Sequence, residues 1–180
     1  MSSYNQSNIR RLAKFLFYVT TLALLALPVL LIVACTQTEM LTEWLREAYS
    51  DYRLPDVISS TKFASILAIE AIGVFLTLFV LWQMRALFAL YMSGETLTER
   101  CAKRILRIGQ GLVAVGCASF FSKTIVVLIL TFHNPPGQRT LSISFGDGDL
   151  GFLLAGALIV VIGWVSKEAA RAAEENKAFV

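Results

Sequence analysis

The sequence predicts an all-α membrane protein with four transmembrane helices. Hydrophobic residues make up 56% of its 180 residues and its mean hydropathy is +0.65, so the chain is more apolar than an ordinary soluble domain. These residues form long blocks with at most one charged residue each, instead of recurring at the period of an amphipathic helix or strand. Four blocks approach the length of about 20 residues that a helix needs to cross a bilayer.

The four predicted spans form one integral membrane domain, residues 1–180, that ends in a tail over residues 167–180. The spans cover residues 15–35, 63–84, 108–132 and 150–166. Pro28 lies inside the first span, where neighbouring groups can replace the hydrogen bond that proline lacks. The fourth span has 17 residues and lies at the lower limit of length.

The basic residues predict that both termini lie in the cytoplasm, because cytoplasmic loops collect Lys and Arg. With the N-terminus inside, eleven basic residues fall on the inner side and four on the outer side. The inner group is Arg10, Arg11, Lys14, Arg85, Arg100, Lys103, Arg104, Arg107, Lys167, Arg171 and Lys177, and the outer group is Arg46, Arg53, Lys62 and Arg139.

The first span has an alternative interpretation as a cleaved lipoprotein signal. Residues 32–35 (Ile-Val-Ala-Cys) resemble a lipoprotein cleavage box, and basic residues precede the apolar run. The run is longer than the apolar region of about 7–15 residues in a signal peptide, and further spans follow it. We therefore favour an uncleaved span, although the sequence leaves open whether Cys35 is ever lipidated.

The first outer loop contains an amphipathic pattern. Apolar side chains recur at helical spacing from Met40 to Tyr52, and acidic residues follow every four positions beside them. This pattern predicts a helix that lies on the outer membrane surface, with Trp44 at the level of the headgroups. Pro55 marks its predicted end.

The inner loop predicts the start of another helix. Thr96 and Glu99 have the spacing of a capping box, and the apolar positions that follow run into the third span without a break. Its basic face can meet anionic lipid.

In the second outer loop, a Pro-Gly turn and alternating residues over 141–145 predict a short hairpin, with Asp149 as the N-cap of the fourth helix. Arg171 and Glu175 stand at i,i+4 and predict a helical tail.

Glu70 and Lys123 are the two ionisable residues well inside predicted spans, where a charge costs at least about 2.5–3.5 kcal/mol. Their positions predict an intramembrane ion pair between the second and third helices. Glu70 shares a helix stripe with Gly73 and Thr77, and Lys123 shares one with Gly116 and Ser119. Small residues at such spacing allow membrane helices to approach closely. Such a pair is either a structural clamp or a proton- or ligand-responsive switch. Alternatively, Lys123 extends towards the interface.

Several function classes find no support in the sequence. The three cysteines are far apart and lack the spacing of a disulfide framework or a zinc site. The two carboxylates of Gly146–Asp149 are too few for calcium, and His133 stands alone at an interface. No catalytic motif and no basic, aromatic groove for nucleic acid is present. We expect no enzyme, no cofactor, no metal and no direct nucleic-acid binding.

Three short motifs, together with the four spans, carry a resemblance to a known family. The motifs are the stretch from Leu87-Phe88 to Gly94-Glu95-Thr96-Leu97, Arg104 to Gly109 (RILRIG) and the ending Glu174 to Val180 (EENKAFV). With these features the chain resembles a bacterial family of uncharacterised membrane proteins, the domain-of-unknown-function family twenty-nine seventy-five. The resemblance implies a location in the bacterial inner membrane.

Members of this family are often encoded beside a small helix-turn-helix regulator, which implies a membrane sensor or antagonist of a cytoplasmic transcription regulator. Its docking surface would be the inner loop and the tail. The candidate docking residues are Arg100, Lys103, Arg104, Arg171, Glu174 and Glu175. The alternatives are a small transporter or channel subunit, which would need to oligomerise, and a structural assembly factor. The small-residue stripe Ala114, Ala118 and Ser122 would serve either that oligomerisation or packing within the chain.

Overall fold

The computed structural model describes residues 3–49, 60–96, 98–131 and 146–178. Its elements are α1 (Ser3–Thr36), α2 (Thr38–Ala48), α3 (Ser60–Met92), α4 (Glu99–Thr131) and α5 (Asp147–Ala178). Each of the four long helices contains a segment long and apolar enough to cross a membrane, as predicted. The fourth segment, Gly148–Glu175, has 28 residues. The predicted fourth span, with 17 residues, was too short because it covered only the uninterrupted apolar block.

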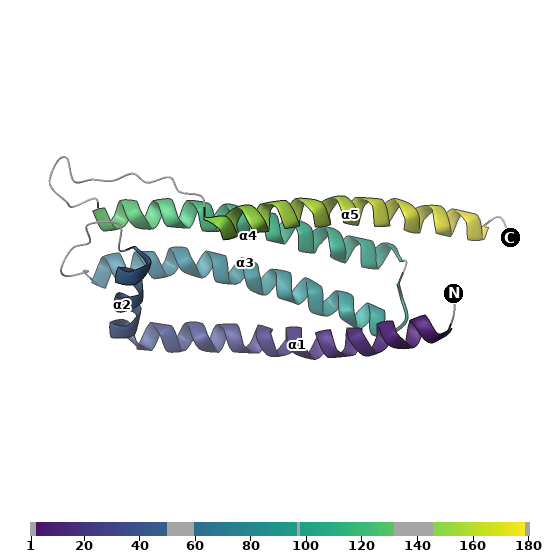
Figure 1. The fold of residues 1–180 in the computed structure, drawn as a ribbon, viewed down its shortest axis with the longest axis horizontal. Coiled ribbons are helices and arrows are strands. Elements are labelled where there is room, and N and C mark those ends of the chain that lie inside the picture. Colours follow the sequence, from purple (N-terminus) through teal and green to yellow (C-terminus); the bar gives the residue numbers. More distant parts are fainter. Residues whose placement is uncertain (1–2, 50–59, 97, 132–145, 179–180) are drawn as a thin grey trace.

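The four long helices run antiparallel, and both ends of the described chain lie at the same end of the molecule (Figure 1). We call this the terminal end, and the opposite end, where α2 lies, the α2 end. Four antiparallel helices place the termini on one side of a bilayer, whichever side that is. Their location in the cytoplasm stays a prediction from the basic residues.

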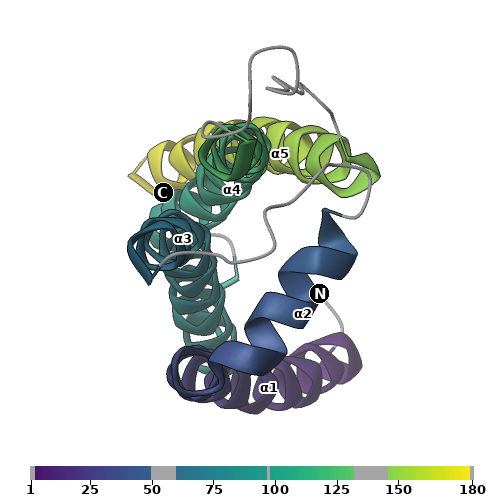
Figure 2. The same cartoon turned by 90° about the vertical axis from the view of Figure 1, so that its left-hand side faces the viewer.

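The long helices form an open row instead of a closed four-helix bundle. Backbone contacts join α1 to α3, α3 to α4 and α4 to α5, but within the described ranges none joins α1 to α4 or α5. The row curves, and α2 lies across its open side at the α2 end (Figure 2). The long helices expose many large apolar side chains, among them Phe15, Leu22 and Leu158. So much exposed apolar surface suits lipid as the solvent.

The amphipathic helix of the first loop is confirmed as α2. Leu45 is fully buried in a cluster with Ile66 of α3 and with Val126 and Leu130 of α4, and this side chain holds α2 against the row. The helix ends at Ala48, with Tyr49 as its C-cap, and therefore stops earlier than predicted. Pro55 lies outside the described residues, and the position of α2 on a membrane surface stays a prediction.

The turn between α3 and α4 corrects the predicted capping box. α3 ends in a Schellman motif: Gly94 has φ +90°, its N–H donates to the Tyr91 carbonyl, and the Glu95 N–H donates to the Leu90 carbonyl. The N-cap of α4 is Thr98 instead of Thr96, because the Thr98 hydroxyl accepts a hydrogen bond from the Cys101 N–H at 3.4 Å. α4 then continues through the third span without a break, as predicted.

Glycines bring α4 and α5 into close contact. A Cβ added at Gly109 would lie 2.6 Å from the Val160 backbone nitrogen, and one added at Gly156 would lie 2.7 Å from the Val113 nitrogen. Only a residue without a side chain allows two helix backbones to approach in this way. The third and fourth spans therefore form the tightest pair, whereas the small residues in the sequence predict a close approach of the second and third.

The remaining predictions concern the second loop and the tail. The predicted hairpin over 141–145 and His133 lie outside the described residues. The tail is helical, because α5 continues to Ala178, and Arg171 donates to Glu175 at 3.1 Å as the i,i+4 spacing predicts.

Candidate functional site

Lys123 forms its ion pair with Asp149 of α5, and the predicted pair with Glu70 is therefore wrong. The Lys123 Nζ atom lies 2.8 Å from Asp149 Oδ2. The Ser119 hydroxyl donates to Asp149 Oδ1 at 2.7 Å, and the Gly146 N–H donates to Oδ2 at 3.0 Å. Three donors thus surround a carboxylate that is 2% exposed.

The error has a clear cause in the packing of α4. The stripe of Gly116, Ser119 and Lys123 is an interface, as predicted, but it faces α5: a Cβ on Gly116 would lie 3.1 Å from the Asp149 carbonyl oxygen. Asp149 is also not the N-cap of α5. It is the third residue of the helix, and its carboxylate reaches back to the N–H of Gly146, as the acidic member of a capping box does.

Glu70 has a separate environment between α3 and α4. The Ser122 hydroxyl, which is buried, donates to Glu70 Oε1 at 2.7 Å. In the described part of the chain, no ion pair joins Glu70 to a basic side chain. Of the two roles predicted for the stripe of Ala114, Ala118 and Ser122, packing within the chain is therefore the one that Ser122 has.

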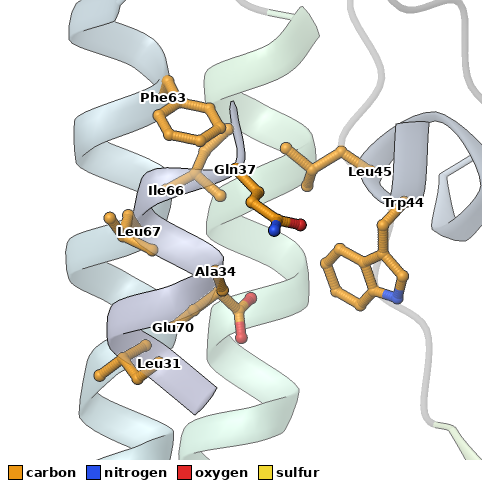
Figure 3. A pocket seen from close by; sticks show the side chains of 9 residues that line it. All are labelled: Leu31, Ala34, Gln37, Trp44, Leu45, Phe63, Ile66, Leu67 and Glu70. Atoms are coloured by element: carbon orange, nitrogen blue, oxygen red, sulfur yellow. The ribbon is translucent and has the colours of Figure 1, made fainter. Parts of the chain in front are cut away.

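An apolar pocket of about 370 Å³ lies next to Glu70 at the α2 end. Its walls come from the last turns of α1, from α2 and from the first turns of α3, and Figure 3 shows the Glu70 carboxylate and the Trp44 indole entering it from different helices. Glu70 is the one ionisable residue among the described residues of the lining. The lining residues are Leu31, Ala34, Gln37, Trp44, Leu45, Phe63, Ile66, Leu67 and Glu70.

Glu70 also lines a second, smaller cavity of about 240 Å³ between α1, α3 and α4. Its lining includes the polar residues Thr77, Ser119 and Ser122 together with Gly73. The Thr77 hydroxyl is directed to its own helix, because it donates to the Gly73 carbonyl at 2.9 Å. Glu70 therefore stands where an apolar pocket adjoins a more polar one.

Charged side chains gather at the terminal end, between the start of α4 and the end of α5. They line a cleft of about 580 Å³ that includes Glu99, Lys167, Glu168, Arg171, Glu174 and the aromatic Trp164. Lys103 pairs with Glu99 at 3.0 Å. Of the candidate docking residues, Arg171 and Glu174 line this cleft, and Arg100, Lys103 and Glu175 are exposed.

Arg104 differs from the other candidate docking residues. It is half-buried and donates to Gln83 Oε1 of α3 at 2.6 Å, and Gln83 is itself buried. Sequence reasoning missed Gln83, whose signal was an uncharged polar residue inside an apolar block. It also missed the role of Arg85, which donates to Thr21 of α1 at 3.0 Å. These contacts tie neighbouring helices of the row together.

The described residues contain no cluster of His, Cys, Asp and Glu that would hold a metal ion. The fold and the pocket thus define a four-helix protein with membrane-like helices and a carboxylate beside an apolar cavity. The family model described as "Protein of unknown function (DUF2975)" matches residues 41–180, and the chain belongs to this family. The match begins within α2. No curated protein and no solved structure matches the chain.

Proposed function

We propose that the protein is a non-enzymatic membrane sensor that binds a ligand at the Glu70 pocket and holds a cytoplasmic helix-turn-helix regulator at the terminal end. The continuity of α4 carries this proposal. Its Ser122 holds the Glu70 carboxylate, and its first turn contributes Glu99 to the charged cleft. The two positions are about 35 Å apart along one uninterrupted helix, at a rise of 1.5 Å per residue.

The proposal places the protein in the inner membrane of a bacterium, with the terminal end in the cytoplasm. Basic residues at that end support this sidedness. The cleft between α4 and α5 offers cations and anions side by side with Trp164, a mixture that suits a protein partner of mixed charge. Coupling follows if a ligand at Glu70 shifts α4 relative to α5, because a rigid helix transmits the shift to the cleft.

A transporter or channel subunit is the second candidate, and one observation favours it. Glu70 lines two adjoining cavities, so a carboxylate stands between an apolar and a more polar compartment. Acidic residues within membrane spans often mark ion or substrate paths. An open row of helices would have to close its concave side with a second copy to enclose such a path.

The test of the sensor proposal is recruitment of a small cytoplasmic helix-turn-helix regulator, which the family resemblance leads us to expect in the gene next to this one. The tagged regulator is co-expressed with the full-length chain, and its share in the membrane fraction is measured. We expect the Lys167→Glu/Arg171→Glu double variant to lower that share at least about tenfold, because both side chains line the cleft. Glu47→Lys changes an exposed residue of α2 at the opposite end and serves as the control.

Equal recruitment by the wild type and the double variant would refute docking at the cleft. The transporter would replace the sensor as the proposed function under two observations. The regulator would not be recruited to the membrane, and the protein would support a solute flux into proteoliposomes that Glu70→Gln abolishes.

A further inference from the structure

Among the described residues that line the apolar pocket at the α2 end, Glu70 is the one charged side chain, and no basic side chain of the described ranges pairs with it. We propose that this pocket binds a lipophilic organic cation, an ammonium-type group on an apolar body, with Glu70 as the counter-ion. The inference deepens the proposed function, on which it rests, by naming the class of ligand.

The charge balance at Glu70 is the first argument. None of the nine lining residues is basic, and Lys123, the nearest candidate from the sequence, is held by Asp149 at 2.8 Å. Ser122 gives the carboxylate one hydrogen bond, whereas Asp149 receives three. An ionised carboxylate in an apolar setting is costly without a cation, so a bound cation stabilises it.

The aromatic walls are the second argument. Trp44 and Phe63 line the same pocket as Glu70, and Figure 3 shows both rings at its sides. Aromatic faces attract cations, tryptophan most strongly, and they recognise alkylammonium groups in particular. The remaining walls, from Leu31, Ile66 and Leu67, offer apolar contact to the body of the ligand.

Size and access agree with a small molecule. A volume of about 370 Å³ falls in the range of about 300–1,000 Å³ that small-molecule sites occupy. Trp44 belongs to α2, which backbone contacts join only to α1 among the described helices. Apart from the contacts of Leu45 with α3 and α4, α2 is attached only through α1, so a ligand can enter beside it without separating the long helices of the row.

The experiment compares two probes that differ in one atom. Benzyltrimethylammonium carries the charge, and neopentylbenzene replaces its nitrogen with carbon. Binding of each to the full-length protein in phosphatidylcholine nanodiscs is measured by equilibrium dialysis, with empty nanodiscs subtracted. We expect the cation to bind and the neutral probe to bind at least about tenfold more weakly.

Three variants test the site. Glu70→Gln should weaken binding of the cation about tenfold or more and leave the neutral probe unchanged, because it removes the charge and keeps the shape. Trp44→Leu should weaken the cation more than the neutral probe. Glu47→Gln removes an exposed acidic charge of α2 outside the lining and should leave both affinities unchanged.

Each alternative outcome has a distinct meaning. Equal affinity for the two probes would overturn the inference and make the pocket a site for neutral lipophiles. Cation binding that survives Glu70→Gln would overturn it as well, because Glu70 would then not be the counter-ion. That result would leave the docking of a regulator untouched. Conversely, specific cation binding without recruitment of the regulator would overturn the proposed function and leave the ligand class standing.

Discussion

Glu70 and Asp149 are two carboxylates on the same half of the molecule, and their surroundings differ. Asp149 lies in the tight α4–α5 pair, where Lys123, Ser119 and the Gly146 N–H saturate it. Glu70 lies at the looser side of α4, with one hydrogen bond from Ser122 and a cavity on either side. The comparison teaches that a saturated carboxylate holds helices together, whereas an undersaturated one beside a cavity is available to a ligand.

The largest effect is expected from Asp149→Asn. The substitution keeps the shape but leaves Lys123 without its counter-ion, and we expect it to lower the free energy of unfolding by about 2–3 kcal/mol. The value lies below that of a fully buried pair because the Lys123 side chain is 39% exposed. Unfolding in mixed micelles by titration with SDS measures it.

The Lys123→Met/Asp149→Asn double variant is the control for this prediction. Removing both charges leaves no unpaired cation, so we expect it to recover most of the lost stability. If Asp149→Asn alone unfolds like the wild type, the pair is not a structural clamp.

The next effect is expected from Gly109→Ala in the α4–α5 contact. Its new methyl group would lie 2.6 Å from the Val160 nitrogen, which belongs to a helix backbone and cannot move aside alone. We expect a loss of about 1–3 kcal/mol in the same unfolding assay. Gly151→Ala is the matched control on α5, because nothing lies within 4 Å of its new Cβ. It should be neutral or slightly stabilising, since alanine favours helix over glycine. Similar results for the two alanines would contradict the close contact.

The smallest effect on stability is expected from Glu70→Gln. Its amide oxygen can still accept the hydrogen bond from Ser122, and no basic partner among the described residues loses a counter-ion. We expect a change below about 1 kcal/mol, of either sign. The variant is thus a test of ligand binding that keeps the fold. A loss as large as that of Asp149→Asn would show that Glu70 is structural as well.

Much of the secondary structure followed from local patterns. Uninterrupted apolar blocks predicted the four long helices, because a membrane span needs little more than length and hydropathy. The period of α2 and the i,i+4 spacing of Arg171 and Glu175 are local too, and both predictions were confirmed. The predicted N-caps were wrong by two or three residues. The N-cap of α4 is Thr98 and not Thr96, and the residue before α5 is Gly146 and not Asp149. An N-cap depends on the residue at which the chain enters the helix, and several nearby polar residues can occupy that position.

The candidate site was predicted less well, because its partners come from different helices. Glu70 and Lys123 were singled out correctly as unusual, since any charge in an apolar block stands out. Their partners, Ser122 and Asp149, depend on which helix each face of α4 meets. The predicted spans placed Lys123 and Glu70 inside the membrane and Asp149 at its outer edge, so depth favoured Glu70 over Asp149, the actual partner of Lys123.

The sequence by itself determined that the chain forms four membrane-like helices, a short amphipathic helix and a helical tail, because hydropathy and period act within one segment. Only the tertiary structure decided that the helices stand in an open row, that glycines join α4 to α5, and that Lys123 belongs to Asp149. These features depend on helix rotation and neighbour choice, which close backbone contact at Gly109 and Gly156 sets and which no pattern within one segment records. The same rotation turns Ser122 towards Glu70 and leaves its carboxylate facing the apolar pocket.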